Sequence, residues 1–333
     1  MTNHGNMYGP DFTFLGIERC DLDKPETYKD ADVVIVGAPI DSGTSHRSGA
    51  KFGPQAIRMG DYLPHDGERP HLALRTDGLK DMKVVDAGDL LMNGGNLEDS
   101  LALLAAATEK ISRTGAIAVI LGGDHSIASA DVAGIANHRG KGKISMVHFD
   151  AHADTGTDQW GALVGHGTPM RRLIENGHVR GDRFLQLGLR GYWPDDATLN
   201  WMRDQGMRSY EMTEIHHRGL KTVLDESFAT LTDGCDGVFL SVDIDVVDPG
   251  MAPGTGTPEP GGMTSRELLE AVRRICLELP VVGIDIVEVA PPFDSADITA
   301  ILANRVVLEA LSAIALRKRV EHIVQPAIYL TAN

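Results

Sequence analysis

The feature that most constrains the fold of this chain is the regular alternation of short apolar runs with helical patterns. Several runs are almost entirely Val, Ile, Leu or Phe, which is typical of strands covered on both faces of a sheet. Alternating strands and helices predict an α/β domain with a mainly parallel sheet. The predicted strands are 32–36, 83–86, 116–121, 144–149, 183–189, 207–210, 238–244 and 281–286.

Helical patterns fill the intervals between these runs. Eight strand–helix units can close into a barrel or form an open sheet with helices on both sides, and the pattern alone leaves both open. In either architecture the active site lies beyond the carboxyl ends of the strands. The predicted helices are 54–61, 97–113, 126–137, 169–176, 195–205, 213–231, 265–277 and 296–317.

Three short clusters of Asp and His stand directly after predicted strands. Alternate residues of an extended chain share a face, so Asp-x-His-x-Asp and Asp-x-Asp spacings direct their side chains to one spot. Four carboxylates and two imidazoles gather there only if cations compensate them, and four negative charges would balance two divalent ions. The predicted metal ligands are His125, in Gly-Gly-Asp-His-Ser, then Asp150, His152 and Asp154, in Asp-Ala-His-Ala-Asp, and Asp243 and Asp245, in Asp-Ile-Asp.

Each cluster has a simpler interpretation when it is taken alone. Asp124 fits a helix cap, the segment 150–156 is faintly similar to a calcium loop, and Asp243 and Asp245 fit turn formers. We favour a metal site because all three clusters follow strands. Asp and His without Cys suit Mn²⁺ better than a thiolate zinc site, and they would also accept Ni²⁺. His148 lies deeper in its strand and is interpreted as a supporting group.

Length, charge and cysteine content narrow the class of protein. We find no linker in the 333 residues, so we predict a single catalytic domain over 31–333, preceded by an arm over 1–30 that lacks clear periodicity. A net charge of −16 disfavours nucleic acid and anionic membranes as partners and suits a cationic substrate. We find no signal peptide and no apolar run of membrane-spanning length. Three widely spaced cysteines predict a reducing compartment, hence a cytoplasmic protein.

These motifs resemble the ureohydrolase family, which includes arginases, agmatinases and guanidinobutyrases. The resemblance covers the three clusters, the segment 48–58, the sequence His-Gly-Thr-Pro at 166–169, and the segment 283–289. The Pro- and Gly-rich stretch 253–262 is similar to the agmatinase branch. The resemblance implies an open three-layer α/β/α architecture with a mainly parallel eight-stranded sheet. It also implies a homotrimer or homohexamer.

The resemblance assigns a role to each candidate residue. It implies one metal bound by His125, Asp150, Asp154 and Asp243, and a second bound by Asp150, His152, Asp243 and Asp245. Glu288 would orient the substrate, because a carboxylate after the last strand can hold a guanidinium through paired hydrogen bonds. His166 would transfer a proton, as histidine does near neutral pH. Taken alone, Glu288 and His166 are also compatible with an exposed glutamate and a surface histidine.

The predicted function is hydrolysis of a small linear guanidino or amidino compound to urea and an amine. The alternatives are a formimino-substrate hydrolase, a guanidine- or biguanide-type hydrolase, a deacetylase of related architecture, and a non-catalytic metal-binding subunit of a hetero-oligomer. The predicted pocket walls are Trp160, Arg190 and Trp193. Asp195 and Asp196 either face the pocket or begin a helix, and we favour the helix. The identity of the substrate stays open.

Overall fold

The computed structural model describes residues 7–9, 12–61 and 69–319 of the chain. Its centre is one sheet with the strand order β2-β1-β3-β8-β7-β4-β5-β6, and all neighbouring strands are parallel. The sequence therefore predicted the fold class correctly. The strands are β1 Val33–Ala38, β2 Val84–Asp89, β3 Ile117–Gly122, β4 Ile144–Phe149, β5 Val179–Leu189, β6 Arg208–Glu211, β7 Gly237–Asp243 and β8 Val281–Val287.

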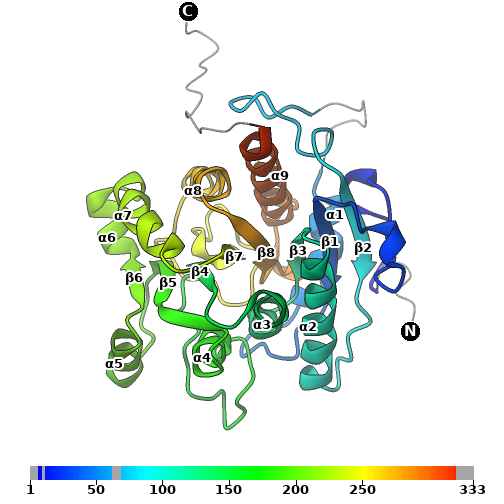
Figure 1. Cartoon of the computed structure of the whole chain (residues 1–333). Helices are drawn as coiled ribbons and strands as arrows, with labels where there is room; N and C mark the ends of the chain where they lie inside the picture. Colours follow the sequence, from blue (N-terminus) through cyan, green and yellow to red (C-terminus); the bar gives the residue numbers. More distant parts are fainter. Residues whose placement is uncertain (1–6, 10–11, 62–68, 320–333) are drawn as a thin grey trace, which may run out of the picture.

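Helices cover both faces of this sheet, which gives three layers (Figure 1). Helices α1, α7, α8 and α9 lie on one face, and α2, α3 and α4 lie on the other. The open architecture is thus the correct one of the two that the pattern allowed. The helices are α1 Gly53–Met59, α2 Leu97–Arg113, α3 Ala128–Arg139, α4 Pro169–Glu175, α5 Asp196–Asp204, α6 Met212–Arg218, α7 Leu220–Thr232, α8 Ser265–Glu278 and α9 Ile298–Arg319.

The side-chain parity of the strands produces two hydrophobic cores. In β1, Val33 and Ile35 pack with residues of α8 and α9, whereas Val34 and Val36 pack with residues of α2 and α3. All six residues of β1 are buried. Burial on both faces explains why this strand is apolar at every position except its glycine rather than at alternate positions.

The sequence predicted one helix over 213–231, and this prediction is wrong. The structure has two helices here, α6 and α7, which meet at Gly219. The φ angle of Gly219 is 83°, in the left-handed region where glycine carries no steric penalty. The hydrophobic periodicity continues across this break, so periodicity alone does not reveal it.

The N-terminal segment packs against the edge strand of its own sheet. Arg19 forms a parallel bridge with Asp86 of β2, and the Cys20 amide donates to the Asp86 carbonyl oxygen at 3.0 Å. Phe14 and Tyr28 are buried in the two cores. Residues 12–30 thus cover part of the edge that β2 would otherwise expose.

The sequence was expected to contain no apolar run long enough to cross a membrane. Helix α9 departs from this expectation, because it is long and apolar enough by length and composition alone. Within the domain, 78% of its most apolar window is buried. It packs against α8 and α1, and its buried side chains contribute to the core on that face of the sheet, so it is a core helix of this fold.

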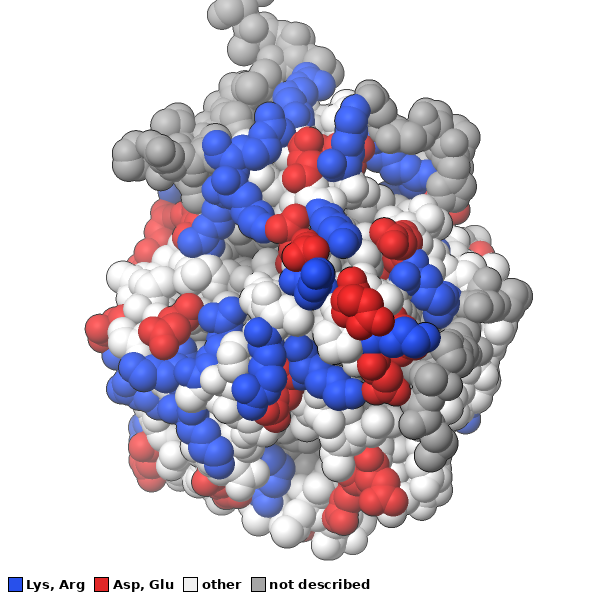
Figure 2. Space-filling view, turned by 45° about the vertical axis from the view of Figure 1, so that its right-hand side comes forward, with Lys and Arg blue, Asp and Glu red and all other residues white. Residues whose placement is uncertain are grey.

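Charged side chains of both signs are mixed on the face of the molecule shown in Figure 2. The surface of the domain carries ion pairs, for example Lys110 with Asp23 at 2.9 Å and Arg113 with Glu109 at 2.5 Å. Exposed pairs of this kind are each worth about 0–1 kcal/mol. The packing of the sheet, rather than these pairs, therefore dominates the stability of the domain.

Candidate active site

The strand order places four polar clusters side by side. In the order β3-β8-β7-β4, His125 follows β3, Glu288 follows β8, Asp243 ends β7 and Asp150 follows β4. Because these strands are parallel, their carboxyl ends meet at one edge of the sheet. Residues separated by more than 160 positions in the sequence thus become neighbours.

The first half of the site surrounds the His125 imidazole. Its Nδ1 atom lies 3.1 Å from Asp150 Oδ2, 3.2 Å from Asp154 Oδ2 and 3.1 Å from Asp243 Oδ2. All four side chains are almost inaccessible to solvent. One imidazole and three carboxylates therefore converge on a single buried point.

The second half of the site surrounds His152. Its Nδ1 atom lies 3.1 Å from Asp245 Oδ2 and 3.4 Å from Asp150 Oδ1. Asp150 therefore directs one oxygen to each half, which is the geometry of a bridging ligand. Asp243 faces the first half with Oδ2, while its Oδ1 accepts a hydrogen bond from the Asp245 amide at 2.8 Å.

A hydrogen-bonded chain behind His125 fixes its tautomer. The Ser241 hydroxyl donates to Asp285 Oδ1 at 2.8 Å, so its oxygen is free to accept from His125 Nε2 at 2.9 Å. With a proton on Nε2, Nδ1 would be available to direct its lone pair at a cation held among the three carboxylates. Supporting groups of this kind orient the ligands in metal sites.

His148 supports the site without being well placed to coordinate. Its Nδ1 atom accepts a hydrogen bond from the Gln186 amide nitrogen at 3.1 Å, so the ring proton must lie on Nε2. Nε2 then donates to Asp150 Oδ2 at 2.8 Å. His148 is close enough to His125, Asp150 and Asp154 to join a metal group, but its Nε2 proton is committed to Asp150.

The donor set fits divalent cations on geometric and electrostatic grounds. Three carboxylate oxygens lie within 3.2 Å of His125 Nδ1, and none of the described Lys or Arg side chains pairs with these carboxylates. Burial and the neighbouring Asp245 and Asp150 raise the pKa of Asp243 well above its usual value. Such a cluster requires positive charge to be stable when it is ionised.

Two residues of the site adopt left-handed backbone conformations. The φ angle is 52° at Asp154 and 61° at Glu288. Such conformations cost non-glycine residues roughly 1–3 kcal/mol and are found where surrounding contacts enforce them. Here the Met170 amide donates to the Asp154 carbonyl oxygen, and the Glu288 amide donates to the Gly123 carbonyl oxygen. Backbone strain is thus present at Asp154, a candidate metal ligand, and at Glu288, the residue predicted to bind the substrate.

Glu288 and His166 form a buried pair next to this cluster. Glu288 Oε1 accepts from the His125 amide and faces His166 Nδ1, both at 2.9 Å. Glu288 Oε2 is buried and has no hydrogen-bond partner. Burial alone would lower the pKa of His166, but the charge of Glu288 raises it to about 9. A buried carboxylate with one open oxygen can accept a cationic group.

Ser45 gives His166 a partner in either protonation state. Its hydroxyl oxygen lies 2.6 Å from His166 Nε2, and its amide nitrogen lies 3.0 Å from the same atom. A protonated Nε2 can donate to the hydroxyl oxygen, and a neutral Nε2 can accept from the amide. His166 can therefore exchange a proton without losing a hydrogen bond.

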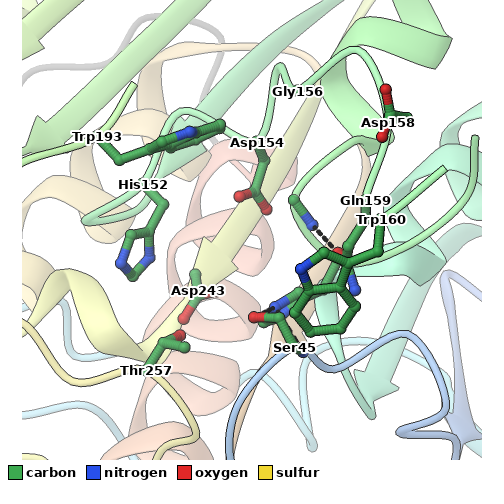
Figure 3. Close-up of a pocket in the computed structure, with 12 residues that line it drawn as sticks. Ser45, His152, Asp154, Gly156, Asp158, Gln159, Trp160, Trp193, Asp243 and Thr257 are labelled. Carbon is green, nitrogen blue, oxygen red and sulfur yellow. Dashed lines mark hydrogen bonds between the residues drawn. The ribbon is translucent and has the colours of Figure 1, made fainter. Parts of the chain in front are cut away.

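A cavity of about 390 Å³ opens above these groups (Figure 3). Ser45, His152, Asp154, His166 and Asp243 contribute to its lining. The tryptophans predicted from the sequence also contribute: Trp193 lies beside His152 on one side, and Trp160 lies near Ser45 on the other (Figure 3). Three of the predicted ligands, His152, Asp154 and Asp243, therefore face a space large enough for a small molecule.

The structure contradicts the prediction that Arg190 forms a wall of this cavity. Arg190 is not part of the lining. Its guanidinium donates to backbone carbonyl oxygens, including those of Asp245 at 2.7 Å and Glu259 at 2.6 Å. Arg190 thus fixes the loop that carries Asp245, and its charge is directed at the backbone rather than at a ligand.

Two other aspartates near the motifs have structural roles. Asp195 caps α5 by accepting from the Thr198 amide at 2.9 Å, as the favoured interpretation proposed. Asp124 accepts from the Ser126 amide at 3.0 Å and from the Gly43 amide at 2.7 Å. Both carboxylates are therefore engaged by backbone donors.

Sequence reasoning missed several residues of the site. Ser45 lies in the loop after β1, and Gln159 fixes the cavity loop by donating to the Gly43 carbonyl oxygen at 2.8 Å. Ser241 and Asp285 lie inside strands, where they appear only as single polar residues in apolar runs. They could have been recognised as polar residues at buried strand positions, because a buried polar group needs a hydrogen-bond partner.

Comparison with known proteins agrees with this geometry. A family model described as the Arginase family matches residues 31–313. Guanidinobutyrase of Pseudomonas aeruginosa is 38% identical over 283 residues, 84% of this chain and 85% of that protein. Mitochondrial agmatinase of Gallus gallus is 39% identical over 282 residues, 84% of this chain and 80% of that protein.

Solved structures lead to the same assignment. Proclavaminate amidino hydrolase from Streptomyces clavuligerus matches with a TM-score of 0.80 at 34% identity, over 93% of this chain and 99% of that chain. Formimidoylglutamase from Bacillus subtilis matches with a TM-score of 0.76 at 30% identity, over 85% of this chain and 86% of that chain. The resemblance to ureohydrolases is thus confirmed, and the chain belongs to the arginase family.

Proposed function

We propose that this protein hydrolyses a C–N bond of a small linear guanidino compound and releases urea and an amine. The observation that carries the proposal is the unpartnered, buried Oε2 of Glu288 beside the metal-ligand cluster and His166. The names of the relatives support the same reaction class, since guanidinobutyrase and agmatinase both take guanidino substrates.

The chain's own residues divide the work of this reaction. Glu288 would bind the guanidinium through Oε2 and hold its carbon toward the ligand cluster. Two divalent ions, when bound, supply the activation of water for attack at neutral pH. The attacking water adds to the guanidinium carbon, the C–N bond to the amine breaks, and urea leaves with the water oxygen.

His166 would supply the proton that the leaving amine needs. Its pKa of about 9 keeps it protonated near neutral pH. His166 and Ser45 both line the cavity, and the Ser45 hydroxyl lies 2.6 Å from His166 Nε2. Protonating the amine makes it a better leaving group, which is the usual contribution of a general acid.

Six residues would bind the two ions, and their role as ligands stays a prediction. Asp150 would bridge, because each of its oxygens faces one half of the site. Oxygen and imidazole donors favour Mn²⁺ as the working ion, with Ni²⁺ as the alternative. The six proposed ligands are His125, Asp150, His152, Asp154, Asp243 and Asp245.

The assembly and the compartment also belong to this proposal. A homotrimer or homohexamer follows from the family resemblance, and light scattering that finds a monomer would contradict it. A cytoplasmic location fits three unpaired cysteines, of which Cys20 and Cys276 are buried. Burial raises the pKa of Cys20 to about 12, so its thiol is poorly reactive.

The test is urea release by purified protein that has been stripped of metal and reloaded with Mn²⁺ or Ni²⁺. We expect urea from at least one linear guanidine, and we expect Glu288→Gln to weaken substrate binding while both ions stay bound. Formamide and an amine from a formimino compound, without urea from any guanidine, would favour the alternative reaction. A Glu288→Gln variant with unchanged kinetics would refute the guanidinium contact.

A further inference from the structure

The carboxylates that line the cavity differ in whether a bound ion or the guanidinium of the substrate would neutralise them. The floor carries carboxylates that two divalent ions would balance, and Glu288 would balance the guanidinium of the substrate. Asp158 belongs to the lining and lies toward the outer end of the loop that also contributes Trp160 (Figure 3). It is the acidic residue of the described lining that neither a metal ion nor a guanidinium would neutralise.

The carboxylate of Asp158 is accessible and only partly engaged. It is exposed, and its Oδ1 accepts one hydrogen bond from the Gly161 amide at 2.8 Å. None of the described cations forms an ion pair with it. Its remaining oxygen can therefore attract a positive group on a ligand that enters the cavity.

Positive side chains near the cavity are engaged elsewhere. None of the described residues that line it is Lys or Arg. Arg190 donates to carbonyl oxygens, as described above, and Arg47 donates to the Thr255 and Gly256 carbonyl oxygens. Arg171 donates to the Thr155 carbonyl oxygen and stacks on an aromatic ring. A carboxylate on a substrate would thus find no cation among the described lining residues.

Two indole rings flank the entrance. Trp160 is 81% exposed and Trp193 is 41% exposed, and they lie on opposite sides of the cavity (Figure 3). Large exposed aromatic side chains at the rim of a concave site are typical of ligand contacts. Indole faces attract cations and also pack against alkyl groups, but they offer little to a carboxylate.

We propose that Asp158, Trp160 and Trp193 form a selectivity element that admits guanidines whose tail is positive or uncharged and rejects those whose tail carries a carboxylate. This inference rests on the proposed hydrolase function and adds the chemistry of the part of the substrate that does not react. Asp158 attracts a cationic tail, and the two indoles enclose its carbon chain.

Three guanidines of similar length separate tail charge from size. Agmatine has a positive tail, n-butylguanidine a neutral one and 4-guanidinobutyrate a negative one. We expect kcat/KM to fall in that order, with agmatine about tenfold above 4-guanidinobutyrate, because exposed charge pairs and repulsions each change affinity by only a few fold. High salt should narrow the difference, since the charge of Asp158 is exposed.

Variants of Asp158 test which residue sets this order. Asp158→Asn should bring agmatine close to n-butylguanidine, and Asp158→Lys should favour 4-guanidinobutyrate over agmatine. Asp204→Asn is the matched control, since Asp204 is exposed on α5 and is not part of the cavity lining, so it should leave the order of the three substrates unchanged.

Variants of the indoles test the second half of the element. Trp160→Ala and Trp193→Ala should raise KM for agmatine roughly two- to fivefold, as expected for exposed cation–aromatic contacts. Tyr192→Ala is the control, because Tyr192 is exposed beside Trp193 but does not line the cavity. An effect of Tyr192→Ala equal to that of Trp193→Ala would contradict the assignment.

The outcomes distinguish this inference from the function on which it rests. Urea release with 4-guanidinobutyrate as the best of the three overturns the selectivity element and leaves the hydrolase function intact. An order that Asp158→Asn and Asp158→Lys leave unchanged overturns the role of Asp158. Urea from other linear guanidines but from none of these three overturns the selectivity element alone. No urea from any linear guanidine, with either metal, overturns the proposed function and this inference together.

Discussion

Two of the buried acidic clusters among the described residues are neutralised in different ways. In the arginine-neutralised cluster, Arg58 binds Asp86 through Nε at 2.9 Å and Nη2 at 3.0 Å, and Asp89 through Nη1 at 2.5 Å. Backbone amides supply further donors, such as that of Phe14 to Asp86 at 2.8 Å. The protein itself thus provides the positive charge for these two carboxylates.

None of the described Arg or Lys side chains pairs with the carboxylates of the metal-ligand cluster. Its four carboxylates face two imidazoles, and supporting groups such as Ser241 and His148 direct lone pairs toward its centre. Placing an arginine here would stabilise the fold but would fill the space that a cation from solution needs. The comparison indicates that a buried acidic cluster is a candidate functional site where no arginine or lysine side chain neutralises its carboxylates.

The largest effect should come from removing a carboxylate of the metal-ligand cluster. Asp243→Asn should abolish urea release, because the first half of the site loses one of its three carboxylates. Elemental analysis of dialysed protein should show about two metal ions per chain before the substitution and fewer after it. Asp225→Asn, on the surface of α7, is the control and should keep both metal and activity. Full activity of Asp243→Asn without bound metal would contradict the site.

A second variant should separate chemistry from metal binding. His166→Ala should lower kcat by about 10²–10⁴-fold, the usual contribution of a general acid or base. Its metal content should stay near two, since His166 contacts Glu288 and Ser45 rather than the proposed ligands. Loss of metal in this variant would make His166 a ligand and the proposed role wrong.

The arginine-neutralised cluster should respond in stability rather than in metal content. Arg58→Met leaves two buried carboxylates unpaired, which should lower the free energy of unfolding by about 3–5 kcal/mol. Urea denaturation followed by circular dichroism measures this loss. Arg266→Met removes only an exposed pair with Glu270 and should change stability by about 0–1 kcal/mol. If both variants lowered the free energy of unfolding equally, Arg58 would stabilise the fold no more than an exposed arginine does.

The smallest effect should come from a group behind the metal ligands. Ser241→Ala removes the partner of His125 Nε2 and should weaken metal affinity about 10–100-fold, as other supporting residues do. Competition with a metal-binding dye measures the change. Retention of full affinity would mean that neighbouring packing, rather than this hydrogen bond, orients His125.

The sequence predicted most of the fold because local patterns control it. Each of the eight strands was placed within a few residues, since strands buried on both faces leave long apolar signals. The break at Gly219 was missed because the apolar period continues through it. The helix 296–317 was predicted close to its observed bounds, but it was not recognised as apolar enough to cross a membrane, because its few polar residues interrupt the apolar run without ending the helix.

By itself, the sequence determined the candidate ligands, because their spacing and their position after strands are local properties. Only the tertiary structure decided how they combine. The order β3-β8-β7-β4 joins clusters that are distant in the sequence, and it makes Asp150 the residue that spans both halves. It also directed Arg190 to backbone carbonyl oxygens and placed Asp158 among the residues that line the cavity. Side-chain direction depends on which backbone groups are nearby, and long-range contacts determine those neighbours.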